Sequence, residues 1–327
     1  MKAVECITAE QIRGLASDFN PAQFEEDRAD VHLLAADDHD GPRAQCSLWW
    51  SRMPRFDAQR VGMIGHYSAT DDPAAEMLLS RATDRLRDVG CTCAIGPIDG
   101  NTWRRYRFVT DAGREPAFFL EPQNPPQWPQ QFVQARFLPI ATYCSALNID
   151  LSQPPRHSNG VAGRLRSAGV VVRSLRAGEI EDYLSRMYRV CCVAFRNHFL
   201  YTELPQDDFI RLYSKILPVL RPELLIVAEQ QTELVGFLFA VPDILRQHGG
   251  IPTDTFIIKT VASLPRRELA GLGTLMVGRA QETGKNLGFR RCVHALMHER
   301  NTLARNISSV YASTMRWYTL YAKDLQA

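Results

Sequence analysis

Two glycines stand where a helix begins, at a point where free backbone amide groups could bind an anion. In LPRRELAGLGTLMVGRAQETGKNLG, residues 264–288, an extended apolar run gives way to a helical pattern at Gly271 and Gly273. Glycine lets a ligand approach the backbone closely, and the first N–H groups of a helix have no intrahelical partner. The helix dipole also favours negative charge, so a pyrophosphate is a natural ligand. The same glycines could serve the geometry of a tight connection alone.

Two common phosphate-binding motifs do not match this stretch. A Rossmann GxGxxG follows the first strand of an alternating strand–helix unit, and a Walker loop requires GxxxxGK[ST]. AGLGTL, residues 270–275, lacks that lysine and lies late in the chain. The sequence therefore predicts neither a Rossmann dinucleotide site nor a P-loop.

A second group of reactive side chains lies in RRCVHALMHER, residues 290–300. If this stretch is a strand, strict alternation places on one face Cys292, His294, Leu296 and His298. Glu299 follows at the end of the strand. An imidazole or carboxylate here could deprotonate an amine, whose pKa of about 10.4 leaves a small nucleophilic fraction at neutral pH. The alternative is an ordinary histidine and a solvated glutamate.

We do not expect a metal site. HxxxH places two zinc ligands together on a helix, but positions i and i+4 of a strand are separated by roughly 13 Å. The eight cysteines are scattered without CxxC pairs. They predict free buried thiols rather than a zinc or redox centre.

The composition is that of a globular protein with two domains. The chain has 327 residues, of which 45% are hydrophobic and 23% charged, and domains usually contain roughly 100–200 residues. A net charge of +2 gives no general electrostatic signal for nucleic acid. No stretch approaches the roughly 18–20 apolar residues that cross a bilayer, and the N-terminus lacks the apolar core of a signal peptide. We expect a cytoplasmic protein that binds neither nucleic acid nor membrane.

A change in composition near the middle of the chain predicts a domain boundary. LNIDLSQPPRHSNGVAGRLRSA, from residue 147, is rich in Pro, Ser, Gly and Asn and has no clear apolar period. We expect an N-terminal domain at residues 1–150, a linker at 151–166 and a C-terminal domain at 167–327.

The C-terminal domain is expected to contain helices and strands that do not alternate strictly. Helices are expected at 179–195, 205–220, 272–287 and 301–313. Strands are expected at 169–175, 223–230, 233–241, 254–264, 290–298 and 315–323, the second and third as a hairpin. Gly288 is well placed to end the third helix.

These residues and this order of elements resemble the GNAT superfamily of N-acyltransferases. In its acyl-CoA signature a strand ends in V-x-P before R/Q-x-x-G-x-G/A, and VASLPRRELAGLG is similar, with Pro265, Gly271 and Gly273 in place. Glu268 stands where the family has Arg or Gln, so its carboxylate must point outward or meet a neighbouring arginine. The resemblance covers the C-terminal half and implies an α/β fold of the α+β type, with a mixed, mostly antiparallel sheet flanked by helices.

The N-terminal half is similar to a degenerate copy of the same fold. A hairpin around an acidic turn, a strand, a helix at 71–90 and another strand follow one another between residues 30 and 97. No glycine pair opens this helix, and Asp71 and Asp72 would repel a phosphate there. The resemblance thus implies two GNAT-like lobes, of which the first is structural and shapes the substrate site.

The resemblance implies acetyl-CoA or another acyl-CoA as the cofactor. Backbone N–H groups of the strand end would stabilise the oxyanion, and the glycine turn would hold the phosphates. The implied cofactor-binding residues are Val261, Ala262, Ser263, Arg266, Arg267, Ala270, Gly271, Leu272, Gly273, Thr274 and Asn301.

The implied reaction is direct attack of an amine on the thioester carbonyl. Tyr311 is the candidate that protonates the departing thiolate, with Ser308 as the alternative, and the splay of strand 290–298 would bring His298 and Glu299 near the acyl group. We expect an enzyme that acylates, most simply acetylates, a primary amine of a small molecule. The alternatives are an inactive acyl-CoA-binding protein and an acyltransferase that modifies a protein or a carrier-bound intermediate.

Two further stretches have more than one interpretation. TWRRYR, residues 102–107, could grip a carboxylate, a phosphate or a nucleic-acid strand, but a solvated strand or loop is favoured. FRNHFLYTELPQDDF, residues 195–209, corresponds to a loop that borders the acceptor cleft in the resembled family. Its acids suit an amine, although Asp207 and Asp208 more simply stabilise the first turn of a helix. The sequence does not predict an oligomeric state.

Overall fold

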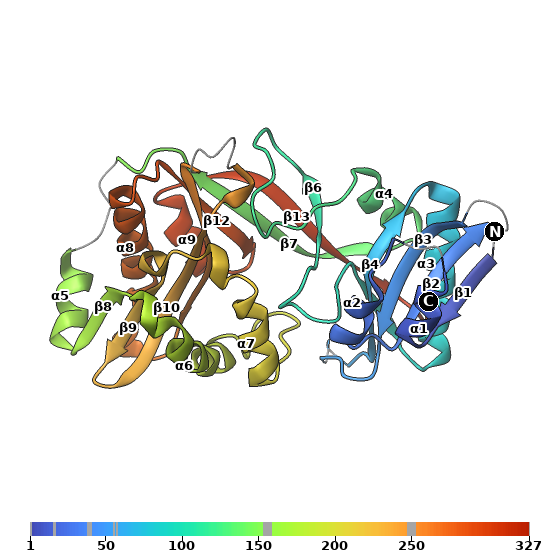
Figure 1. Ribbon diagram of the computed structural model, residues 1–327, viewed down its shortest axis with the longest axis horizontal. Coiled ribbons are helices and arrows are strands. Elements are labelled where there is room, and N and C mark those ends of the chain that lie inside the picture. Colours follow the sequence, from blue (N-terminus) through green and yellow to red (C-terminus); the bar gives the residue numbers. More distant parts are fainter. Residues whose placement is uncertain are drawn as a thin grey trace.

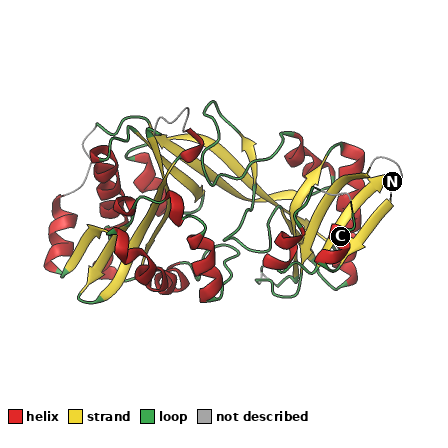
Figure 2. Ribbon diagram, in the orientation of Figure 1, coloured by secondary structure: helices red, strands yellow, loops and turns green. Residues whose placement is uncertain are grey.

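The protein consists of two lobes, and in each of them helices flank one part of a shared sheet (Figure 2). The computed structural model describes residues 2–15, 18–37, 41–54, 56, 58–152, 159–246 and 253–326. The N-terminal lobe is formed by β1 (Lys2–Cys6), α1 (Ala9–Arg13), α2 (Pro21–Glu26), β2 (Val31–Asp37), β3 (Gly41–Trp49), β4 (Val61–Ala69), α3 (Asp72–Asp88), β5 (Cys93–Gly96), β6 (Phe108–Asp111), α4 (Gln127–Gln134) and β7 (Leu138–Asn148).

The C-terminal lobe contains the remaining elements. They are α5 (Asn159–Ser167), β8 (Val170–Ser174), α6 (Ile180–Ala194), α7 (Gln206–Ser214), β9 (Ile226–Gln230), β10 (Glu233–Pro242), β11 (Thr255–Ser263), α8 (Leu272–Asn286), β12 (Arg291–His298), α9 (Thr302–Ser309) and β13 (Ser313–Asp324). Helices pack on both faces of this sheet, which explains why β10 is buried along nearly its whole length.

One continuous sheet runs through both lobes. The strand order is β1-β2-β3-β4-β5-β13-β7-β12-β11-β10-β9-β8, with β6 beside β13. Among the described residues, β4 with β5 and β11 with β12 are the parallel pairs, and α3 and α8 connect them. Each lobe therefore contains one strand–helix–strand crossover, on which the candidate site depends.

The two strands in the middle of the sheet belong to both lobes. β7 and β13 pair with one another, β7 also pairs with β12, and β13 also pairs with β5. Figure 1 shows the two strands side by side between the lobes. The end of the chain thus completes the sheet of the first half, an exchange that no sequence pattern predicted.

Most expected elements are confirmed. β9 and β10 form the expected hairpin, and Gly288 follows α8 at φ 91°. The last expected helix is shorter than predicted, because α9 ends at Ser309. The linker expected at 151–166 was wrong in its second part, since α5 begins there and packs on β8 and α8. Residues 153–158 of the linker and the hairpin turn at 38–40 lie outside the described residues.

The cysteines are free thiols, and the helices are too short or too polar to cross a membrane in the described part of the chain. The eight cysteines are free, and all but the partly buried Cys192 are buried, as predicted for structural thiols. Within the described ranges, none of the helices is long and apolar enough to span a bilayer.

Candidate functional site

β11 and β12 lie side by side at one end and diverge at the other. Their parallel pairing covers Thr255–Ile258 and Arg291–His294 and stops there. The paired residues are mostly buried, whereas residues 259–261 of β11 and 296–298 of β12 are partly accessible. Beyond the last pair, the edge of β11 that faces β12 has no strand partner among the described residues. Unpaired backbone groups along such a strand edge are the kind of partner that an extended ligand chain binds.

The turn before α8 leaves the first amide groups of that helix free. Gly271 adopts the left-handed conformation at φ 87°, and no side chain caps the helix. The first backbone hydrogen bond runs from the N–H of Leu275 to the carbonyl oxygen of Gly271 at 3.1 Å. Within the described residues, the N–H groups of residues 272–274 have no acceptor. Together with the helix dipole, they form a site suited to an anion.

Helix α5 contacts this turn from the expected linker. The guanidinium of Arg164 donates to the carbonyl oxygen of Glu268 at 2.8 Å and to that of Ala270. A Cβ at Gly271 would lie 2.7 Å from Cγ1 of Val161. Glycine is thus required at 271 by the left-handed backbone and by α5, independently of any ligand.

The carboxylate of Glu268 points outward. The neighbouring Arg266 forms an ion pair with Glu233 at 2.6 Å instead. Glu268 is exposed, and among the described residues it takes part in no ion pair. An exposed carboxylate is screened by solvent, so its repulsion of an anion in the turn is weak.

The alternation expected along β12 is broken by a bulge. Pairing with β7 shifts between His294 and Met297, where two residues of β12 lie opposite one residue of β7. Leu296, within this bulge, adopts φ 61°. An extra residue moves every later side chain to the other face. The prediction that Cys292, His294, Leu296 and His298 share one face was therefore wrong. The side chains of His294 and His298 lie on opposite faces of the sheet.

His298 faces the junction between the lobes. Its ring lies 4.7 Å from that of Tyr143 and 5.8 Å from that of Phe199, in the loop after α6. Its Nδ1 accepts a hydrogen bond from the N–H of Arg300 at 3.0 Å. Desolvation lowers the pKa of His298, which favours the neutral ring. With Nδ1 accepting, the neutral ring carries its proton on Nε2 and presents a donor.

Tyr311 and Ser308 lie near His294, on the face of the sheet covered by α8 and α9. The Tyr311 ring is 6.3 Å from that of His294. The hydroxyl oxygens of Tyr311 and Ser308 are buried, and neither has a hydrogen-bond partner in the ranges that the structure describes. Leaving a buried hydroxyl unpaired is costly, so both groups are available to a ligand.

Some of the other residues expected at the site have structural contacts, and others border the place where β11 and β12 diverge. Val261–Ser263 pair with β10 on one side and border the divergence on the other. A Cβ at Gly273 would lie 3.4 Å from Ile307 and 3.7 Å from Val261, so the glycine turn, β11 and α9 meet here. Asn301 caps α9 by accepting from the N–H of Ala304 at 3.0 Å. In the described part of the chain, no group of three or more His, Cys, Asp or Glu residues could hold a metal ion.

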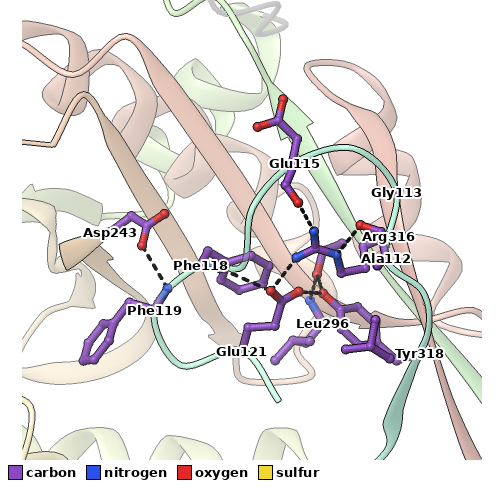
Figure 3. Close-up of polar contacts among 12 residues, drawn as sticks. Ala112, Gly113, Glu115, Phe118, Phe119, Glu121, Asp243, Leu296, Arg316 and Tyr318 are labelled. Carbon is purple, nitrogen blue, oxygen red and sulfur yellow. Dashed lines mark hydrogen bonds and ion pairs between the residues drawn. The ribbon is translucent and has the colours of Figure 1, made fainter. Parts of the chain in front are cut away.

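A buried charged cluster lies where the lobes meet. The guanidinium of Arg316 donates to the carboxylate of Glu121, as does the hydroxyl of Tyr318. Figure 3 shows both side chains pointing toward Glu121. The Tyr318 hydroxyl is also 2.9 Å from Oγ of Ser145, which accepts from the N–H of Leu296 at 3.0 Å. The cluster thus connects the β12 bulge to the N-terminal lobe.

The sequence favoured a solvated strand or loop at residues 102–107, but this stretch packs against the protein. Trp103 donates from Nε1 to the carbonyl oxygen of Thr202 at 2.9 Å, so the stretch packs on the loop after α6. Arg107 is only 5% exposed. Asp208 lies in the first turn of α7, as expected, and pairs with Arg28 of the other lobe at 2.9 Å.

Comparisons with known proteins support the fold. No family model matches the chain, and no curated protein matches it. Among solved structures, a GCN5-related N-acetyltransferase from Sphaerobacter thermophilus is similar, with a TM-score of 0.51 and 12% identity over 98% of this chain and 90% of that one. A tandem GNAT protein from the clavulanic acid biosynthesis pathway has a TM-score of 0.50 and 11% identity over 99% and 98%.

A third solved structure is similar over part of its length. It is the fungal multi-domain GH3 β-N-acetylglucosaminidase with a GCN5-related glucosamine N-acetyltransferase region. The TM-score is 0.54 and the identity 12% over 98% of this chain. This chain spans 38% of that protein's length.

Proposed function

We propose that this chain, which has the tandem GNAT fold, is an acyl-CoA-dependent N-acyltransferase that acylates a primary amine of a small molecule. The observation that carries the proposal is the uncapped start of α8 beside the divergence of β11 and β12. The diphosphate of CoA needs donors and positive potential, which residues 272–274 supply. The pantetheine chain needs extended backbone partners, which Val261–Ser263 supply.

Arg164 adds a cation to the proposed phosphate site. Its guanidinium already bonds to the turn through the carbonyl oxygens of Glu268 and Ala270. Remaining N–H groups of the guanidinium can donate to a phosphate oxygen. This charge offsets that of the Glu268 carboxylate, which stands where the resembled family has Arg or Gln.

In the proposed reaction, the amine nitrogen attacks the thioester carbonyl carbon and the C–S bond breaks. The thiolate takes up one proton and the attacking amine loses one. Burial raises the pKa of Tyr311, so its hydroxyl stays protonated at neutral pH and can donate to the thiolate. Ser308, 2% exposed and nearby, is the alternative donor. Backbone N–H groups of Val261–Ser263 are the proposed oxyanion donors.

His298 and Glu299 take different roles in this proposal. Because Nδ1 of His298 accepts from Arg300, its Nε2–H is a donor toward the acceptor or the oxyanion. Glu299, the remaining candidate at the strand end, is the proposed proton acceptor. Its main chain is fixed by a hydrogen bond to the carbonyl oxygen of Thr142 at 2.9 Å.

The two lobes have separate roles in the proposal. Residues 167–327 form the acyl-CoA-binding lobe, and residues 1–150 form a lobe that shapes the acceptor side of the site. The segment 151–166 joins them and contributes Arg164 through α5.

A direct assay of acyl transfer tests the proposal. The protein is incubated with labelled acetyl-CoA and a panel of primary amines, while thiol release and labelled amide are followed. We expect thiol release that depends on the amine. Release without amine would indicate a thioesterase, and acetyl-CoA binding without turnover would indicate a binding protein. Transfer only to a protein or a carrier-bound acceptor would exclude the small-molecule acceptor.

A further inference from the structure

Lys259 occupies the mouth of the divergence without a partner. It is the first residue of β11 beyond the last pair with β12, and it lies in a bulge, because Thr260 and Ile258 oppose adjacent residues of β10. Among the described residues, its ammonium group has no hydrogen bond or ion pair. Burial, aided by the charge of Arg107, lowers the pKa of Lys259 to about 7. Part of the surface of Lys259 remains accessible.

Arg107 reaches the same place from the N-terminal lobe. Its guanidinium lies 3.8 Å from the ring centre of Tyr106 and 4.1 Å from that of Tyr143. Its Nη1 lies 3.5 Å from the carbonyl oxygen of Leu296, at the bulge of β12. Its Nε is buried and finds no acceptor among the residues that the structure describes, and its backbone adopts φ 68°. A left-handed arginine is rare, so the surrounding rings hold it in this conformation.

The charges around these two residues do not balance. Arg316 and Glu121 form a buried pair and neutralise one another. In the described part of the chain, neither Arg107 nor Lys259 forms an ion pair with a carboxylate. The charge of Arg107 lowers the pKa of Lys259, and the Glu121 carboxylate, which is already paired with Arg316, raises it. Two unpaired cations in a desolvated place are unfavourable unless an anion joins them. The partly buried His298, on the same face of the sheet, adds a hydrogen-bond donor but no negative charge.

We infer that Arg107 and Lys259 form an anion-binding subsite at the mouth of the divergence, and that the acceptor amine carries a carboxylate or phosphate group. The inference rests on the proposed function, because the subsite would bind the acceptor next to the acyl group of an acyl-CoA that lies between β11 and β12. Arg107 positions the anion through its planar guanidinium, and Lys259 supplies a second charge. The amine of the same molecule is then held near the thioester.

A set of matched amines tests the inference in the acyl-transfer assay. The pairs are β-alanine and ethylamine, tyrosine and tyramine, and phosphoethanolamine and ethanolamine. We expect the anionic member to have at least about 30-fold higher kcat/KM, because a site that pairs with an anion rejects the neutral analogue. Preference within the carboxylate pairs alone identifies an amino acid, and preference within the phosphate pair alone identifies a phosphorylated amine. Equal kcat/KM within every pair overturns the inference.

Two variants separate anion binding from a role in packing. Arg107→Met should lower kcat/KM about 30-fold for the anionic member, mainly through KM, and much less for the neutral member. Lys259→Met should have the same selective effect, about tenfold. The control is Arg105→Met, an exposed arginine on the same stretch. Thermal unfolding reports whether each variant folds, and Arg107→Lys is the conservative substitute. An equal loss of kcat/KM for both amines of a pair would show that the two residues have only a structural role.

The pH dependence of KM provides a readout that packing does not affect. An anion favours the charged ammonium of Lys259, whose pKa is about 7 without ligand and higher with it. Affinity is therefore full below pH 7 and is lost as the pH rises toward the pKa of the complex. Lys259→Arg stays charged, so its KM should not rise over that range. The groups around this ammonium are Arg107 and Glu121, and next to them Tyr143, His298, Arg316 and Tyr318.

A failure of the proposed function would be distinguishable from a failure of the subsite. If no amine reacts, the enzyme proposal fails, and the subsite is then tested by calorimetric titration of phosphoethanolamine and ethanolamine, and of β-alanine and ethylamine, into the CoA-bound protein. Selective binding of an anionic amine that Arg107→Met abolishes supports the subsite. Equal binding, or no binding of either member in both pairs, contradicts it.

Discussion

The two lobes contain the same strand–helix–strand crossover, but the first turn of the crossover helix is capped in one lobe and uncapped in the other. In the N-terminal lobe, α3 follows β4 and is capped by Asp71, whose side chain accepts from the N–H of Ala74 at 3.0 Å. Pro73 in the same turn has no N–H. In the C-terminal lobe, α8 follows β11 and begins at Gly271 without a cap. A carboxylate of the chain thus takes the place in one lobe that we assign to a diphosphate in the other.

The strands before these helices show the same contrast. His66 lies in a bulge of β4, as Lys259 lies in a bulge of β11. Nε2 of His66 is 2.8 Å from a carboxylate oxygen of Asp27, and its Nδ1 is 2.9 Å from Oγ of Ser47. Ser47 is fully buried and also lies 2.8 Å from Nδ1 of His32, so this Ser-His-Asp group is closed to substrate. Side chains of the N-terminal lobe thus satisfy the start of α3 and the ring of His66, whereas among the described residues the start of α8 and the ammonium group of Lys259 have no such partner.

The largest expected effect concerns the buried cluster of the N-terminal lobe. Asp27→Ala should lower the free energy of unfolding by about 3 kcal/mol, because it leaves the charge of Arg104, 2.9 Å away, without its buried partner. Chemical denaturation measures the loss. The affinity for acetyl-CoA should stay unchanged in conditions where the variant is folded. Loss of CoA affinity without loss of stability would show that the N-terminal lobe contributes to the cofactor site.

Placing a carboxylate at the start of α8 should make the two lobes alike. Gly273→Asp is expected to weaken acetyl-CoA binding about 30-fold, or about 2 kcal/mol, because its carboxylate accepts the free N–H groups and repels the diphosphate. A Cβ at this position meets only ordinary contacts, with Ile307 at 3.4 Å and Val261 at 3.7 Å. Calorimetric titration gives the affinity. Gly273→Asn is the matched control with the same shape and no charge, and an equal loss in it would argue against phosphate repulsion.

A smaller effect is expected from the arginine that α5 adds to the turn. Arg164→Met should weaken acetyl-CoA binding about fivefold, or about 1 kcal/mol, through loss of one charged donor at a solvated site. Arg166→Met, an exposed arginine on the same helix, is the control. Both variants are compared by the same titration with acetyl-CoA and with pantetheine, which lacks the diphosphate. A similar loss of affinity for pantetheine would show that Arg164 does not act through a contact with the diphosphate.

Local patterns predicted the elements and the glycine turn, because helix period, strand alternation and caps act within a few residues. Gly271 and Gly273 marked a turn that the structure confirms, and Asp71 marked a helix start that it also confirms. The linker was misjudged for the opposite reason. The second part of the expected linker has little apolar period of its own, and its helix packs against α8 through Val161.

Tertiary contacts decided the rest of the site. Leu296 adopts φ 61° in a bulge that no residue type signals, and this single feature moves His298 to the other face of β12. Arg107 was assigned to a solvated stretch, because the tyrosine at 143 that stacks on it is distant in sequence. The strand exchange between β7 and β13 likewise depends on pairing between distant segments. Nothing in the sequence around Lys259, a lysine in an apolar strand, indicates a binding site, because its neighbours in space are distant in sequence.

The most direct test of the central claim is a crystal structure of the protein with acetyl-CoA. We predict diphosphate oxygens within hydrogen-bond distance of the N–H groups of Leu272, Gly273 and Thr274, with the pantetheine chain between β11 and β12. Acetyl-CoA bound at α3 of the other lobe, or a turn at α8 that stays covered by α5 with the nucleotide elsewhere, would contradict the claim.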